Sequence, residues 1–384
     1  MRICLLKVAP IADDPRVRKQ GDALLSAGHD VWAVGTAGGR SEAPTWPVST
    51  VAPPSRTLMA KISAALRLLV LGRIGPASRL LYWSFREHRD LLRAARARPA
   101  DLYLASDWRV LPVALAAAAD VGADVGYDSH ELGVEEFLER RLWRLLFPPF
   151  VRSVERRSLP SVRFVTTVSE GIAGIIQTEY ALPRRPVVVR NVPAYERAEF
   201  RPTGATIEVL YHGMFISNRG LEPLIESVVA WRPEFRLTLR GFGKPEYQRR
   251  LQRLVASSPA SRRIALEPPV PMTELIRAAC TADIGIHPLL VTSNQMRYTL
   301  PNKLFEYLMA GLAVCVTGIP EMAEIVERFG VGVTVPEPTA AGIAAAVNSL
   351  DRASIDACKQ RALVAAKELC WEHEAEKLLA VVGR

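Results

Sequence analysis

Short apolar runs alternate with amphipathic stretches from the start of the chain. An apolar run at residues 2–8 is followed by a loop at 9–15 and a helical stretch at 16–27. Gly28 ends the helical stretch, and the next apolar run occupies residues 30–35. Alternation on this scale predicts strands and helices of parallel α/β units.

The same alternation fills the rest of the chain in two series. The first series has further predicted strands at 101–106, 123–128, 162–169 and 186–193. The second series has predicted strands at 207–213, 235–243, 263–270, 283–289, 313–318 and 331–335, and helices beginning at 221, 245 and 273 and near 302. A polar stretch at 193–206 separates the series. We therefore expect an N-terminal Rossmann-like domain at 1–195, a C-terminal one at 205–365, and a last helical segment at 366–384.

Composition narrows the class of protein. At 384 residues the chain is too long for one ordinary core, and no apolar run approaches the ~20 residues of a membrane span. The five cysteines are scattered, which predicts neither a disulfide framework nor a structural zinc and favours a reducing cytoplasm. They stand at Cys4, Cys280, Cys315, Cys358 and Cys370.

Most of the net charge of +9 lies in one segment, residues 61–98. This segment carries nine Lys and Arg residues against two acidic ones, and leucines and aromatic residues stand between them. Two interpretations stay open: a basic amphipathic surface for an anionic membrane, or a solvated helix face on its own domain. No signature of a nucleic-acid-binding motif accompanies the charge, so nucleic acid is not an expected partner.

Candidate ligand-binding residues stand where strands of the second series end. Gly213 ends a strand, and Arg219 stands at the start of the following helix. Lys303 is close to another predicted helix N-terminus, with Glu306 one turn later. Glycines, cations and helix N-termini suit a phosphate, and a carboxylate suits a ribose diol. There are two plain alternatives. Gly213 and Arg219 could simply end a strand and form the turn after it, and Lys303 and Glu306 could form an i, i+3 pair on a helix surface.

The order of these motifs resembles the retaining "group 1" glycosyltransferases of the GT-B fold. The second half contains Arg219-Gly220, Gly241-Phe242-Gly243 and PNKLFEYLMAG with Glu306. The first half contains DPRVRKQGDALLSAGHDV, YDSHEL, TTVSEGIA and RNVP in the family's order. The resemblance implies two Rossmann-like domains facing each other across a cleft, with the C-terminal helix packing back towards the N-terminal domain.

The resemblance also implies a role for each matching residue. Arg219 and Lys303 would neutralise the leaving diphosphate, and Glu306 would hold the ribose. His130, in the loop YDSHEL, would lie near the transferred sugar, although it could instead be a loop cap held by Asp128 or Glu131. The implied catalytic residues are His130, Arg219 and Lys303, and the implied donor-binding residues are Gly213, Arg219, Gly241, Gly243, Val270, Tyr298, Asn302, Lys303 and Glu306.

Two positions depart from the family's pattern. Tyr298 stands where the first glutamate of an E-x7-E motif is expected, and Met214 replaces a basic residue that often follows the strand-end glycine. No Asp-x-Asp motif occupies a suitable loop, so we expect no metal and no cofactor besides the nucleotide-sugar co-substrate.

These observations lead to one expected function and two alternatives. We expect transfer of a sugar from a nucleotide-sugar to an acceptor hydroxyl with retention, in cell-surface glycan or glycolipid synthesis. The acceptor is a glycan, a lipid-linked precursor or a small molecule, and the enzyme is cytoplasmic or peripheral at the inner face of the membrane. The alternatives are a nucleotide-sugar epimerase and a catalytically degenerate transferase-like subunit. A nicotinamide dehydrogenase is disfavoured because no G-x-G-x-x-G follows the first strand.

Overall fold

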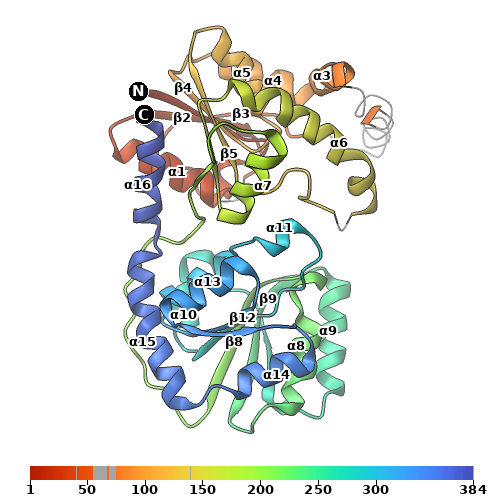
Figure 1. Ribbon diagram of the computed structural model, residues 1–384, viewed down its shortest axis with the longest axis vertical. Coiled ribbons are helices and arrows are strands. Elements are labelled where there is room, and N and C mark those ends of the chain that lie inside the picture. Colours follow the sequence, from red (N-terminus) through yellow and green to blue (C-terminus); the bar gives the residue numbers. More distant parts are fainter. Residues whose placement is uncertain (40, 55–66, 69–74, 139, 384) are drawn as a thin grey trace. The chain divides into compact units, whose positions relative to one another are not determined.

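The computed structural model describes residues 1–39, 41–54, 67–68, 75–138 and 140–383. The chain divides into two compact units. Unit 1 consists of Met1–Arg190 and Ala375–Arg384, and unit 2 of Asn191–Glu374. Each unit has its own parallel sheet with helices packed on it (Figure 1).

The described strands of unit 1 form a sheet in the order β3-β2-β1-β4-β5-β6-β7. The strands are β1 (Arg2–Leu6), β2 (Asp30–Thr36), β3 (Val48–Val51), β4 (Leu102–Ser106), β5 (Asp124–Ser129), β6 (Phe164–Thr167) and β7 (Val187–Val188). The helices are α1 (Pro15–Ser26), α3 (Gly75–Ser84), α4 (Arg86–Arg96), α5 (Leu111–Ala119), α6 (Arg141–Ser158) and α7 (Glu170–Tyr180). Local sequence sets the helix starts: Asp14 caps α1 by accepting from the N–H of Val17, and Pro15 occupies the first turn.

The described strands of unit 2 form a sheet in the order β10-β9-β8-β11-β12-β13. The strands are β8 (Ile207–Phe215), β9 (Phe235–Gly243), β10 (Ile264–Glu267), β11 (Ile284–His287), β12 (Ala313–Thr317) and β13 (Gly332–Val335). The helices are α8 (Leu221–Ser227), α9 (Pro245–Ser257), α10 (Leu275–Ala279), α11 (Asn294–Arg297), α12 (Asn302–Met309), α13 (Pro320–Phe329), α14 (Ala340–Asn348) and α15 (Arg352–Glu368).

The central strands are apolar on both faces because helices cover both sides of each sheet. All residues of β4 and of β12 are buried, as continuous apolar runs predict for parallel strands. In each sheet the strand order reverses once, between β1 and β4 in unit 1 and between β8 and β11 in unit 2. Ligands of open parallel sheets bind beyond the carboxyl ends of the strands at such a switch point.

The predicted helical segment at the C-terminus is divided between the units. The helix α16 (Trp371–Val382) follows α15, and the residues from Ala375 onward pack with unit 1, where Arg163 Nη2 donates to the carbonyl of Val382 at 2.6 Å. The unit boundary lies at 374, later than the expected boundary at 366, because α15 packs on α12 and β12 of unit 2. Within the described part of the chain, no helix has the length and apolar character needed to cross a bilayer.

Candidate active site

The Lys303 ammonium lies beside the backbone of Gly213 at the carboxyl end of β8. Gly213 has φ +122°, and a Cβ added there would be 3.3 Å from Lys303 Nζ. The same Nζ lies 3.4 Å from Tyr211 Oη and 4.7 Å from the centre of the tyrosine ring. Thus the predicted glycine and lysine meet at the switch point, with Tyr211 supporting the lysine through a cation–π contact.

The surroundings of Lys303 disfavour its protonated form. Burial and the nearby Arg219 guanidinium lower the pKa of Lys303 to about 7, although Glu306 acts in the opposite direction. Two cations with little opposing charge favour an anionic ligand, since its charge would stabilise the protonated lysine. Diphosphate is such a ligand.

The loop that carries Arg219 is fixed against β11. Arg219 ends a short 3₁₀ turn, Ser217–Arg219, and Gly220 follows with φ +68°. A Cβ on Gly220 would lie 2.0 Å from the carbonyl oxygen of Pro288, so only glycine fits. The backbone N–H of Leu290 donates to the carbonyl of Asn218 at 3.1 Å, which ties the turn to the segment after β11.

Glu306 pairs with a histidine that the sequence interpretation did not assign. His212 Nε2 lies 2.8 Å from Glu306 Oε2, and the His212 side chain is 1% exposed. In place of the alternative surface pair between Lys303 and Glu306, the structure has this contact and the Lys303–Tyr211 contact. Glu306 keeps 19% of its side chain exposed, so it remains accessible to a ligand.

His287, at the end of β11, is a second histidine without an expected role. It is fully buried, and neither ring nitrogen has a hydrogen-bond partner within the described residues. Burial, followed by the charges of Lys303 and Arg219, holds its pKa well below the usual range. His287 is therefore a neutral imidazole next to the two cations.

The structure shows a packing requirement at Gly241 and Gly243, in addition to the donor-binding role that the resemblance implies. A Cβ on Gly241 would lie 1.9 Å from the carbonyl oxygen of Gly213, and one on Gly243 would lie 2.4 Å from that of Phe215. Both glycines are needed where β9 passes β8, whether or not a nucleotide is bound.

The other predicted donor residues lie at three separate chain segments. Val270 follows β10, Tyr298 follows α11, and Asn302 is the exposed first residue of α12. None of the contacts described above involves these residues. The cluster that the structure brings together in unit 2 comprises Gly213, Arg219, Lys303 and Glu306, joined by Tyr211, His212 and His287.

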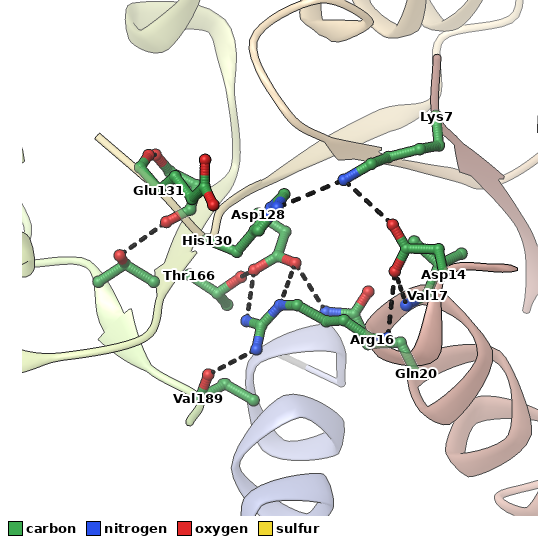
Figure 2. A network of polar contacts seen from close by, with 12 residues as sticks. Lys7, Asp14, Arg16, Val17, Gln20, Asp128, His130, Glu131, Thr166 and Val189 are labelled. Atoms are coloured by element: carbon green, nitrogen blue, oxygen red, sulfur yellow. Dashed lines mark hydrogen bonds and ion pairs between the residues drawn. The ribbon is translucent and has the colours of Figure 1, made fainter. Parts of the chain in front are cut away.

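In unit 1, a buried ion pair holds the strand that leads to His130 (Figure 2). Arg16 donates to both carboxylate oxygens of Asp128 at 2.7 Å, and Gln20 and Thr166 donate to the same carboxylate at 2.9 and 2.8 Å. Although burial opposes ionisation, Arg16 keeps the pKa of Asp128 below its usual range. Asp128 is thus fully occupied and does not cap His130.

His130 instead faces Lys7, the residue after β1 (Figure 2). Lys7 Nζ lies 3.5 Å from His130 Nε2 and 3.3 Å from Asp14. An ammonium has only donors, so Nε2 must accept and Nδ1 carries the proton. Burial and Lys7 lower the pKa of His130 to about 4, and Nδ1 has no partner in the described structure. The Nδ1–H group of His130 therefore makes no hydrogen bond among the described residues.

A group of charged side chains lies next to His130 beyond β4. Asp107 has φ +102°, a rare conformation for a non-glycine residue, and accepts from the backbone N–H of Arg109 at 2.9 Å. Arg109 also pairs with Glu136 at 2.8 Å. Burial, with Glu136 and Asp107 nearby, raises the pKa of Glu131 to about 7. Asp107, Glu131 and Glu136 line one small cavity together with His130.

The sequence interpretation missed Lys7, Tyr211, His212 and His287. Lys7 and His287 stand at the carboxyl ends of β1 and β11, so a search of every strand end for polar side chains would have found them, whereas Tyr211 and His212 lie inside β8. Among the described residues, no group of three or more His, Cys, Asp and Glu side chains is arranged to hold a metal ion, and all five cysteines are free thiols.

Comparisons with known proteins identify both halves of the chain. The family model "Glycosyltransferase Family 4" matches residues 16–192, and the model "Glycosyl transferases group 1" matches residues 206–352. A search by sequence among curated proteins finds no match.

Solved structures of low sequence identity share the fold over the full length. Sucrose-phosphate synthase from Thermosynechococcus elongatus has 16% identity and a TM-score of 0.73, covering 100% of this chain and 98% of that chain. HepE from Anabaena, in complex with UDP and glucose, has 14% identity and a TM-score of 0.72, covering 100% and 99%. A glycosyltransferase from Rickettsia africae has 12% identity and a TM-score of 0.71, covering 99% and 97%. With its two parallel-sheet units and both family matches, the chain belongs to the group 1 glycosyltransferases of the GT-B fold and is a nucleotide-sugar-dependent glycosyltransferase.

Proposed function

We propose that this enzyme transfers a sugar, with retention, from a nucleoside diphosphate sugar to an acceptor hydroxyl in cell-surface glycan or glycolipid synthesis. The observation that carries the proposal is the unit 2 cluster, where Lys303 and Arg219 gather positive charge beside Glu306. Structures of HepE hold UDP and UDP-glucose, which makes UDP-sugars the first donors to test.

The cluster suits a reaction in which a diphosphate departs. As the bond between the anomeric carbon and the phosphate oxygen breaks, negative charge develops on that oxygen. Lys303 and Arg219 would stabilise this charge without the need for a metal, and the N-terminus of α12 would add its partial positive charge. The acceptor oxygen would then bond to the anomeric carbon on the face that the diphosphate leaves, and its proton would pass to the leaving group or to water.

Unit 1 would contribute the unused Nδ1–H of His130 to an oxygen of the sugar or of the acceptor. The neutral state of this histidine is stable at physiological pH because burial and the nearby Lys7 oppose its protonation. His130 would then donate a hydrogen bond without carrying a positive charge.

The direct test measures release of nucleoside diphosphate from UDP-, GDP- and ADP-sugars, with and without glycan or lipid acceptors. We expect acceptor-dependent release from at least one donor, and an α-linked product from an α-linked donor by NMR. Lys303→Ala should abolish release, whereas Lys367→Ala, an exposed control on α15, should not. Acceptor-independent isomerisation of the donor sugar would instead show an epimerase.

We also propose that the acceptor is membrane-bound, but the structure changes which surface supports this. Much of the predicted basic segment 61–98, including Lys61 and Arg73, lies outside the described residues. In its described part, three of the four arginines of α4 form ion pairs, Arg86 and Arg93 with Asp90 and Arg96 with Asp120. The fourth, Arg89, donates to the backbone carbonyl of Trp83. The solvated-face interpretation therefore suits α4.

A better candidate for membrane contact is the start of α6, residues 140–145. Leu142 and Leu145 are 70% and 54% exposed and lie one helical turn apart. Arg140, Arg141 and Arg144, all exposed, flank them. The exposed leucines could enter the apolar boundary of an anionic bilayer while the flanking arginines contact its negatively charged headgroups.

A further inference from the structure

His212 and Glu306 form a contact that the proposed donor site alone does not explain. His212 lies inside β8 and Glu306 on α12, 94 residues later. The imidazole is almost entirely buried, while the carboxylate is partly exposed. The buried His212 thus contacts the accessible Glu306, and this pair joins β8 to α12, the helix of the predicted ribose site.

Several contacts fix the direction of the imidazole. The backbone N–H of His212 donates to Tyr307 Oη at 3.1 Å, and that hydroxyl donates to the carbonyl of Ile286 at 3.3 Å. The rings of His212 and Tyr307 pack with their centres 4.6 Å apart. Because Tyr307 is fully buried, the histidine has little freedom to turn away from Glu306.

The two carboxylate oxygens of Glu306 differ in their hydrogen bonds. An ionised carboxylate only accepts, so His212 Nε2 donates to Oε2. His212 Nδ1 has no partner in the described structure and needs none as an unprotonated acceptor. Glu306 Oε1 makes no hydrogen bond among the described residues and is available to a ligand.

We propose that His212 is a positioning residue that holds Glu306 by Oε2 and directs Oε1 to the ribose diol of the bound donor. This inference rests on the proposed function and on the role that the family resemblance implies for Glu306, which would hold the ribose of the donor. A 2′-deoxyribonucleoside diphosphate would leave part of the oriented carboxylate without its hydroxyl partner.

Calorimetry with UDP, GDP, ADP and CDP, each paired with its 2′-deoxy counterpart, tests the proposal. For the best-bound base we expect the wild type to prefer the ribonucleotide about tenfold or more. His212→Leu should reduce this preference to about threefold or less. Inorganic pyrophosphate, which has no ribose, should bind the variant as it binds the wild type.

Two amide variants, His212→Gln and His212→Asn, distinguish loss of the hydrogen bond to Glu306 from a general disturbance of the fold. In His212→Gln the amide nitrogen reaches the position of Nε2, so the ribose preference should be retained; in His212→Asn it reaches only that of Nδ1, so the preference should be lost. If the Leu variant does not fold, the Gln and Asn variants carry the comparison.

The outcomes separate this inference from the proposed function. If the wild type binds ribo- and deoxyribonucleotides equally, Glu306 does not hold the ribose. The ribose-binding role of Glu306 and the positioning role of His212 are then both wrong. If the wild type discriminates but His212→Leu and His212→Asn discriminate as strongly, the ribose site stands and the role of His212 is wrong.

Discussion

Lys303 is the residue whose charge should respond most to a bound ligand. Its pKa of about 7 should rise when a diphosphate binds, because the anion stabilises the protonated form. Below pH 7 the lysine is already charged, so binding takes up little proton there. Above pH 7 binding must be accompanied by proton uptake, and affinity should fall as pH rises.

This coupling is measured by calorimetry at pH 8 in buffers of different ionisation enthalpy. At that pH a terminal phosphate, whose second pKa is about 6, is already ionised. We expect the wild type to take up close to one proton and Lys303→Arg to take up almost none, since arginine is always charged. An uptake that is the same in both proteins would place the titrating group elsewhere.

At the scale of elements, the close contact between β8 and β9 depends on glycine. Gly241→Ala would place a Cβ 1.9 Å from the carbonyl oxygen of Gly213, so the strands would have to separate. We expect a loss of about 1–3 kcal/mol in the free energy of unfolding, measured by thermal or urea unfolding.

Gly174→Ala is the matched control. A Cβ at Gly174, inside α7, would meet only side-chain nitrogens of Arg185 at 3.6 Å. This change should leave stability equal or slightly higher, because alanine favours a helix. Equal stability of the two variants would mean that the strands accommodate the extra methyl group.

The elements were predictable from the sequence because their signals are local. The apolar runs predicted the central strands. The family resemblance added candidate roles for Lys303 and Glu306. The site contacts were not predictable from local pattern: His212 meets Glu306 across 94 residues, and Arg16 meets Asp128 across 112.

The exposed start of α6 makes a separate prediction about membranes. The protein should co-sediment with vesicles containing phosphatidylserine but not with neutral phosphatidylcholine vesicles, and salt should weaken the binding. Leu142→Glu with Leu145→Glu should release the protein by removing apolar contact and adding negative charge. Val364→Glu, an exposed apolar position on α15, is the control.

If the wild type remains in the supernatant with anionic vesicles at low salt, the membrane proposal is wrong and a soluble acceptor is preferred. Binding that survives the double substitution in α6 would mean that another surface makes the contact.

At the scale of the whole molecule, transfer should proceed without a divalent metal. Charge neutralisation in the proposed mechanism comes from Arg219, Lys303 and the N-terminus of α12. Activity assayed by product formation should therefore survive an excess of EDTA. Full loss of turnover, restored by manganese, would contradict this mechanism.

The most direct test of the whole account is the binding of nucleoside diphosphates alone, measured by calorimetry. The account predicts that at least one of UDP, GDP, ADP and CDP binds, and that Glu306→Ala weakens that binding by about 1–3 kcal/mol. Glu327→Ala, an exposed carboxylate on α13, should bind as the wild type does. Binding that Glu306→Ala and Lys303→Ala both leave unchanged, or no binding of any of the four, would contradict the assignment of the donor site to unit 2.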